Sequence, residues 1–235
     1  MRHFIIPARG GSKTVQDKNL RDLGGVPLIG WSIARAQEAA GHEGIVVVDS
    51  DDRKILDIAE GLGAKPYLRP SYLGDDHATM KDVVKEYFSR NEEIQEIVLL
   101  FPTCPFRTSD SIRRAISLYQ LRQASSLMSV SPCNRRPYGG VLIVDGKIQF
   151  AETAEAFYRK QDTPALYFAN GSIFIINRDE IGRLNTQMFN AETVPFVMDG
   201  LEEIDIDTEL DLTICQALVT AGAVSAPLFG PLVRQ

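Results

Sequence analysis

The sequence predicts an α/β fold built around a doubly wound, mostly parallel sheet. Short runs of consecutive apolar residues, typical of strands buried on both faces, alternate along the chain with longer segments of helical period. The chain has 235 residues, of which 44% are hydrophobic, and this suits one domain with a sizeable core. We therefore expect a single domain over residues 1–235, with an insertion at about 133–165.

Strands are expected where an apolar run shows no polar alternation. Residues 45–48, with the sequence Ile-Val-Val-Val, show this most clearly. The other runs are similarly short and alternate with the helical segments. The expected strands are residues 4–7, 44–49, 96–101, 126–130 and 172–176.

Helices are expected where apolar residues recur at a spacing of three or four. In residues 27–40, for example, Ile29, Ile33 and Ala36 share one face, and Gly41 follows as a stop signal. The same kind of spacing continues along the chain. The expected helices are residues 27–40, 51–63, 79–90, 109–122 and 208–221.

The regular alternation of strands and helices breaks at residues 135–150. Asp145-Gly146 stands there between two β-type runs, which is a strong signal for a hairpin. A two-stranded hairpin is marginally stable in isolation, so it needs a surface to pack on. A partner subunit or a small domain of its own would supply that surface.

The charge and the cysteine content argue against several classes of protein. A net charge of −6 disfavours non-specific nucleic-acid binding, which needs a broad basic face. The three cysteines, Cys104, Cys133 and Cys215, are too widely spaced to indicate a zinc site or a disulfide framework. The first residues turn polar at once, unlike a signal peptide, and no apolar run approaches about 20 residues. We expect no membrane association and a cytoplasmic location.

A glycine-containing loop with three cations follows the first expected strand. Gly10 and Gly11 allow the backbone to approach an anion, and Arg9, Lys13 and Lys18 supply positive charge. The pattern is neither a Walker A loop nor a G-x-G-x-x-G motif. The alternative is a basic turn without a ligand, but three cations around the glycine pair favour a phosphate site.

Carboxylates occur near the ends of other elements, where ligands of parallel sheets bind. Asp205 and Asp207 are two residues apart, so in an extended segment both point to the same side. Oxygen ligands of this kind suit Mg²⁺, whereas the alternative role for Asp207 is to cap the last helix. The acidic residues 49–52 form a second candidate cluster, but Ser50 or Asp51 is more simply explained as a helix cap.

Two residues of the segment 102–107 also have alternative roles. Arg107 either reaches a substrate anion or pairs with Asp110. Cys104 has no histidine near it in sequence, so it is interpreted as a small buried side chain rather than a nucleophile.

These motifs resemble, in order and over nearly the whole chain, those of the acylneuraminate (nonulosonate) cytidylyltransferases, also called CMP-sialic acid synthetases. The most specific are Ile-Pro-Ala-Arg-Gly-Gly-Ser-Lys at residues 6–13 and Ile-Asp-Ile-Asp-Thr-Glu-Leu-Asp at residues 204–211. The others are residues 18–19, 27–29, 68–70, 99–100, 102–103, 105, 107–108 and 170–171. The resemblance implies a three-layer Rossmann-like nucleotidyltransferase domain, with the inserted β-hairpin as a dimerisation segment of a homodimer.

The resemblance also implies a reaction and a set of site residues. CTP and a nine-carbon α-keto acid sugar of the sialic, legionaminic or pseudaminic type would give the CMP-sugar and pyrophosphate, with Mg²⁺ as cofactor. Catalytic roles would fall to Arg9, Lys13, Lys18 and Asp207, and metal binding to Asp205 and Asp207. The implied nucleotide contacts are Ala8, Arg9, Gly10, Gly11, Ser12, Lys13, Lys18, Asn19, Arg69 and Ala78. The implied sugar contacts are Phe101, Arg159, Lys160, Gln161, Asn170 and Phe174.

The chain departs from this family mainly on the sugar side. Phe101 stands where sialic acid enzymes usually have Gln, Cys104 where they have Ser, and Phe174 where an aromatic hydroxyl is expected. Two alternatives therefore stay open. The chain could be a related nucleotidyltransferase that uses another keto-deoxy sugar or nucleotide, or a non-catalytic nucleotide-binding relative.

Overall fold

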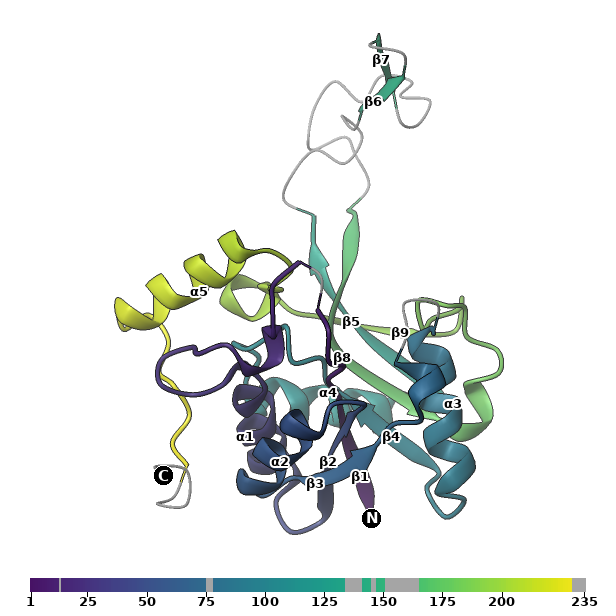
Figure 1. Ribbon diagram of the computed structural model, residues 1–235. Helices are drawn as coiled ribbons and strands as arrows, with labels where there is room; N and C mark the ends of the chain where they lie inside the picture. The colour runs from purple at the N-terminus through teal and green to yellow at the C-terminus, as the bar shows by residue number, and fades with distance from the viewer. Residues whose placement is uncertain (13, 75–77, 134–140, 145–146, 151–164, 230–235) are drawn as a thin grey trace.

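Seven strands form one sheet, in the order β3-β2-β1-β4-β8-β5-β9 (Figure 1). The computed structural model describes residues 1–12, 14–74, 78–133, 141–144, 147–150 and 165–229. β8 runs antiparallel to β4 and β5, whereas the other neighbouring pairs are parallel, so the predicted mostly parallel sheet is confirmed. The strands are β1 (Arg2–Pro7), β2 (Gly44–Ser50), β3 (Lys65–Leu68), β4 (Glu96–Leu99), β5 (Ser126–Pro132), β8 (Tyr167–Asn177) and β9 (Val194–Val197).

Helices cover both faces of this sheet and give the three-layer α/β arrangement that was expected (Figure 1). The helices are α1 (Leu28–Ala40), α2 (Arg53–Gly61), α3 (Met80–Arg90), α4 (Ser109–Leu121) and α5 (Glu209–Thr220). Short 3-10 helices are η1 (Lys18–Leu20), η2 (Ser71–Leu73), η5 (Arg178–Glu180) and η6 (Gly200–Glu203). None of the helices in the described ranges has the length and apolar character needed to cross a membrane.

Successive strand residues enter two separate cores, because their side chains point alternately to the two faces. Phe4 and Ile6 of β1 pack with residues of α1, α2 and α4 on one face. Ile5, between them, packs with residues of α3 on the other face. Both faces of the sheet are therefore buried, which explains the continuous apolar runs of the sequence.

A third cluster joins the C-terminal helix to the N-terminal part of the chain. Leu212 and Cys215 of α5 belong to the same buried cluster as Trp31 of α1 and Phe106. Ile206, which lies between the two acidic residues noted above, is fully buried in this cluster. This packing holds the segment 204–207 at a fixed place beside the sheet.

The inserted segment contains a separate two-stranded antiparallel sheet. Its strands are β6 (Val141–Val144) and β7 (Lys147–Phe150). In Figure 1 this pair lies beyond the ends of β5 and β8, away from the main sheet. The Asp145-Gly146 turn lies outside the described residues, and the dimerisation role stays a prediction.

Two strands, β3 and β9, were not expected from the sequence. Each has four residues and includes a proline, Pro66 in β3 and Pro195 in β9. Both are edge strands, where a missing backbone N–H is tolerated because one side of the strand has no partner. Because these strands are short and contain a proline, the search for continuous apolar runs did not predict them.

The predicted cap of α2 is wrong. Neither Ser50 nor Asp51 caps it; the Asp52 side chain accepts a hydrogen bond from the Lys54 amide at 2.8 Å. At α5 the cap is Thr208, which forms a reciprocal capping box. Asp207 is therefore not the cap of α5. Helix capping was the main alternative to a ligand-binding role for Asp207, and the structure removes it.

Candidate active site

A cavity of about 330 Å³ lies at the carboxyl ends of the central strands. Its walls come from the loops after β1, β3 and β4, from the start of α3, and from the acidic segment before α5. This is the edge of a parallel sheet at which ligands bind. The lining residues are Pro7, Arg9, Ser12, Thr14, Lys18, Asn19, Arg69, Met80, Phe101, Pro102, Thr103 and Asp207.

Lys18 joins the glycine-containing loop to the acidic segment. Its Nζ donates to the Ile206 carbonyl oxygen at 2.7 Å and lies 3.6 Å from a carboxylate oxygen of Asp207. Asn19 is buried beside it and donates from Nδ2 to the Arg9 carbonyl oxygen at 3.0 Å. Residues nearly 190 positions apart in sequence are therefore held together at one side of the cavity.

The two glycines of the loop have different surroundings. Gly11 has a φ of +65°, a backbone conformation that residues with a side chain rarely adopt. The Gly10 amide donates to the Asp51 carboxylate at 2.8 Å, so this predicted phosphate donor is already used within the protein. A Cβ atom at Gly10 would lie 3.0 Å from Cβ of Asp52, so a side chain there would have to displace the start of α2.

Arg69 and Asp49 form a buried ion pair under the cavity. Nε of Arg69 donates to the Asp49 carboxylate at 2.9 Å, and Nη2 donates to the Asp49 carbonyl oxygen at 3.2 Å. Burial raises the pKa of Asp49, and the charge of Arg69 opposes that rise. Two bonds to one residue fix the plane of the guanidinium, which is useful for recognising a planar ligand.

The acidic residues 49–52 are therefore used within the protein rather than for a metal. Asp49 binds Arg69, Asp51 binds the Gly10 amide, and Asp52 caps α2. In the part of the chain that the structure describes, no three His, Cys, Asp or Glu side chains come together as a metal cage. A cation at this cavity would need substrate oxygens or water in addition to protein ligands.

Asp205 and Asp207 flank the buried Ile206 side chain and both face outward from the core. The Ile206 amide donates to the Thr103 carbonyl oxygen at 2.9 Å, and the Thr103 side chain hydrogen-bonds the Asp205 carboxylate. The Asp205 residue is exposed as a whole, but protein atoms exclude water from its carboxyl group, and this raises the pKa of Asp205. The nearby negative charge of Asp207 raises that pKa further. Two carboxylates that repel one another in this way form a donor set that fits a hard divalent cation.

The two acidic residues line different cavities. Asp207 lines the 330 Å³ cavity, whereas Asp205 lines one of about 520 Å³, together with Asn170. Both polar ends of the Asn170 side chain are engaged, since Oδ1 accepts from the Ser129 hydroxyl at 2.5 Å and Nδ2 donates to Ser131 at 2.9 Å. Asn170 therefore shapes the cavity wall as part of a polar network between β5 and β8.

The remaining predicted contacts are spread over other places. Phe174 is buried behind Phe101, and Ala78 lines a separate cavity of about 590 Å³. Ala8 is buried, and its amide donates to the Asp49 carbonyl oxygen at 2.8 Å. Predicted contacts outside the described residues are Lys13, Arg159, Lys160 and Gln161.

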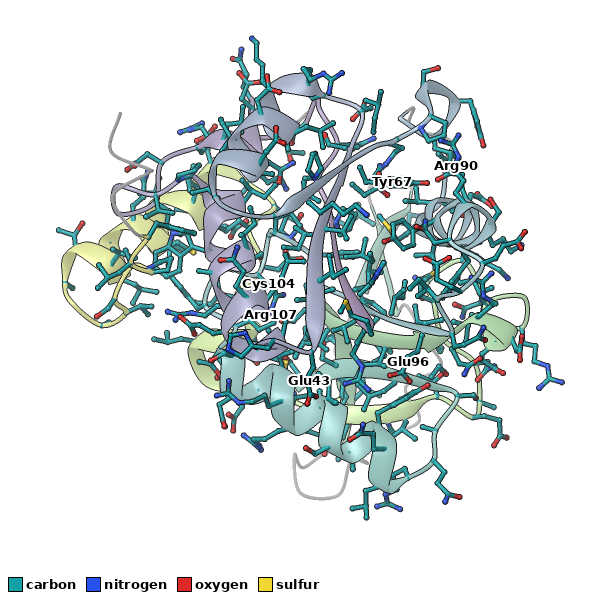
Figure 2. All side chains as sticks on the ribbon, turned by 90° about the horizontal axis from the view of Figure 1, so that it is seen from below. Glu43, Tyr67, Arg90, Glu96, Cys104 and Arg107 are labelled. Carbon is teal, nitrogen blue, oxygen red and sulfur yellow. The ribbon has the colours of Figure 1, made fainter. Side chains whose placement is uncertain are left out.

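Arg107, which is labelled in Figure 2, has neither of the roles considered for it, because the residue is only 1% exposed. Nη1 donates to the carbonyl oxygens of Phe101 at 3.2 Å and Ser172 at 2.6 Å, and Nη2 donates to the Ser32 hydroxyl at 2.8 Å. Burial lowers the pKa of Arg107 to about 10. The residue ties the loop after β4 to β8 and α1, and its charge alone would have suggested an exposed position.

Cys104 is confirmed as a buried side chain, 1% exposed, and its thiol donates to the Asn170 carbonyl oxygen at 3.4 Å. Burial raises the pKa of Cys104 to about 12, so almost no thiolate exists near neutral pH. We expect iodoacetamide at pH 8 to leave Cys104 unmodified in the folded protein while it labels the partly exposed Cys133. Peptide mass spectrometry measures this, and rapid native labelling of Cys104 would contradict it.

Comparisons with known proteins give consistent matches. The model of the cytidylyltransferase family matches residues 3–216. An N-acylneuraminate cytidylyltransferase of Streptococcus agalactiae serotype V is 33% identical over 209 residues; the match covers 88% of this chain but only 50% of that protein. A CMP-N,N'-diacetyllegionaminic acid synthase of Legionella pneumophila is 32% identical over 222 residues, which cover 92% of this chain and 94% of that one.

A solved structure of CMP:2-keto-3-deoxy-manno-octonic acid synthetase complexed with CTP has a similar fold. Its TM-score is 0.72, and the match covers 94% of this chain and 99% of that chain. At 18% sequence identity this likeness concerns the fold alone.

Proposed function

Because the chain belongs to the cytidylyltransferase family, we propose that it transfers CMP from CTP to the anomeric hydroxyl of a nine-carbon α-keto acid sugar, releasing pyrophosphate. Two relatives are named for N-acylneuraminate and for N,N'-diacetyllegionaminic acid. The observation that carries the proposal is the 330 Å³ cavity, which brings Arg9, Lys18, Arg69 and Asp207 together.

The order of the strands supports an order of subsites along the cavity. Arg69 follows β3, Arg9 follows β1, and Phe101 follows β4, and these strands lie in the order β3-β2-β1-β4. We assign the cytosine to the Arg69 end, with Asn19 and the backbone near Ala8 as further contacts. The triphosphate would then lie over the loop after β1, and the sugar would approach from the side of β4.

In this arrangement the protein acts mainly by positioning and by stabilising charge. Arg9, Lys13 and Lys18, with the amides of Gly11 and Ser12, would hold the triphosphate and the departing pyrophosphate. Asp205 and Asp207 would hold Mg²⁺, which when bound neutralises phosphate charge and favours ionisation of the sugar hydroxyl. Lys18 is placed to fix the backbone of the acidic segment against the phosphate loop through its bond to Ile206.

We further propose that the enzyme is a homodimer and works in the cytoplasm. Phe168 of β8 and Ile214 of α5 are 55% and 44% exposed and line the same 520 Å³ cavity, so apolar surface lies open at the base of the inserted segment. By resemblance to the family, the inserted segment of a second copy would contribute Arg159, Lys160 and Gln161 to the sugar side. Cys104 and Cys215 are buried thiols outside any disulfide, which suits a reducing compartment.

The proposed function is tested by measuring pyrophosphate release over a matrix of nucleotides and keto-acid sugars. We expect release with CTP, Mg²⁺ and at least one nine-carbon α-keto acid sugar, and much less with UTP, GTP or ATP. Release with another nucleotide would instead indicate a related nucleotidyltransferase. Binding of CTP without turnover of any sugar in the panel would favour a non-catalytic relative and would overturn the proposal.

A further inference from the structure

Asp49 is a fully buried carboxylate near the end of β2. One oxygen, Oδ1, accepts the hydrogen bond from Nε of Arg69, whereas Oδ2 has no hydrogen-bond partner among the described residues. Glu86 and Asp51, the other charges that act most strongly on this carboxylate, are both negative. Among these neighbours only Arg69 compensates the buried charge of Asp49, so moving the guanidinium away would be strongly unfavourable.

The backbone holds Arg69 in the same place. Its amide donates to the Ser50 carbonyl oxygen at 2.9 Å, and its Nη2 donates to the Asp49 carbonyl oxygen at 3.2 Å. Arg69 is therefore anchored through both its main chain and its side chain to the last two residues of β2. Its side chain is only 3% exposed, although it lines the 330 Å³ cavity, so it presents a small and fixed part of itself to a ligand.

The bonds to Asp49 decide which N–H groups of Arg69 are left for a ligand. A guanidinium carries five N–H donors, and Asp49 takes the edge that Nε and Nη2 form. The end of the fork, with one N–H from each Nη nitrogen, makes no hydrogen bond within the described part of the chain. These two parallel donors match two neighbouring acceptors that lie in one plane.

This arrangement suits a nucleobase better than a phosphate group. The Arg69–Asp49 pair has no net charge, whereas binding of a triphosphate relies on uncompensated cations. Cytosine presents two neighbouring acceptors, the ring nitrogen N3 and the carbonyl oxygen O2, whereas uracil carries an N–H at position 3. The second N–H of the fork would therefore meet an acceptor in cytosine but another donor in uracil.

We propose that Asp49 is a positioning residue that holds Arg69 as a fork for N3 and O2 of cytosine and thereby sets the preference for CTP over UTP. This rests on the proposed function, in which the cytosine lies at the Arg69 end of the cavity. A good bidentate contact to a base discriminates by about 10- to 100-fold. Without the charge of Asp49, the guanidinium of Arg69 would lose its fixed plane, and the discrimination would fall while triphosphate binding persists.

The test measures the Kd of CTP and of UTP by calorimetry with Mg²⁺ and without sugar, so it does not require turnover. We expect the wild type to bind CTP at least about 10-fold more tightly than UTP, and Asp49→Asn to reduce this ratio at least about fivefold. Inorganic tripolyphosphate, which has no base, should bind both proteins equally. Arg69→Lys should also reduce the ratio, and adding Asp49→Asn to it should cause no further loss, because Asp49 acts through Arg69.

Glu86→Gln is the matched control for the loss of a buried carboxylate. Glu86 also pairs with an arginine, Arg90, but it lines the separate cavity of about 590 Å³. Its replacement should lower the thermal stability and leave the ratio of the two Kd values unchanged. A merely structural role for Asp49 predicts that Asp49→Asn behaves in the same way.

An Asp49→Asn protein with the wild-type ratio, or with weaker tripolyphosphate binding, would overturn the inference and leave the proposed function intact. A measurement on the wild type keeps the inference testable if no Asp49 variant folds. There, 3-deaza-CTP, which has a C–H in place of N3, should bind at least about 10-fold more weakly than CTP, and equal binding would overturn the fork. Absence of CTP binding by the wild type would overturn the proposed function, and this inference with it.

Discussion

Replacing Asp207 with asparagine should lower kcat about 100-fold and raise the Mg²⁺ concentration needed for half-maximal rate. The substitution removes one of the two carboxylates that are proposed to hold the metal. The Asp207 carboxylate lines the cavity and lies 3.6 Å from Nζ of Lys18. The Asp207 side chain is 75% exposed and is not the cap of α5, so the thermal stability should stay the same. Initial rates over a Mg²⁺ series, with a melting curve, measure both effects.

Glu209→Gln is the matched control for this change. Glu209 carries the same type of charge two residues further on, is 54% exposed and pairs with Arg21 at 2.7 Å, away from the cavity lining. Its rate and Mg²⁺ dependence should match the wild type. An Asp207→Asn enzyme with an unchanged Mg²⁺ dependence would contradict the assignment of the metal to this segment.

Arg107→Ala should be the most destabilising of the single substitutions considered, by about 3–5 kcal/mol. The substitution removes the guanidinium, which donates hydrogen bonds to the carbonyl oxygens of Phe101 and Ser172 and to the hydroxyl of Ser32. It also leaves a cavity in place of a fully buried side chain. Urea unfolding monitored by the fluorescence of Trp31, which is the one tryptophan of the chain, measures this loss.

Arg113→Ala provides the control for the loss of an arginine. Arg113 lies on α4, and its hydrogen bond to the Glu38 carbonyl oxygen is exposed, so its replacement should change the free energy of unfolding by no more than about 0.5 kcal/mol. A loss below about 1 kcal/mol for Arg107→Ala would mean that the guanidinium does not hold the loop after β4 in place.

Much of the fold was predictable because burial of both sheet faces imposes continuous apolar runs. Residues 45–48 show this for β2, whose central residues face both cores. The edge strands were not predicted because an edge strand can be short and needs no full set of backbone donors, as Pro66 and Pro195 show. The prediction therefore missed the two edge strands, which are the part of the sheet that burial constrains least.

The candidate site was predictable where a motif ends a strand, since such ends meet at one edge of a parallel sheet. That reasoning brought Arg9, Lys18 and Asp207 to one cavity. It could not reveal the pairing of Asp49 with Arg69, because that contact depends on the unexpected strand β3. In sequence, both residues look like surface charges.

The central claim is that CMP is transferred to the anomeric oxygen of a keto-acid sugar, and phosphorus NMR tests this most directly. The sugar would carry ¹⁸O in its anomeric hydroxyl, and the reaction would contain CTP and Mg²⁺. We predict a CMP-sugar phosphorus signal with the isotope shift of a bridging ¹⁸O, together with unlabelled pyrophosphate. Formation of CDP and inorganic phosphate, or of CMP with no ester to the sugar, would contradict the account.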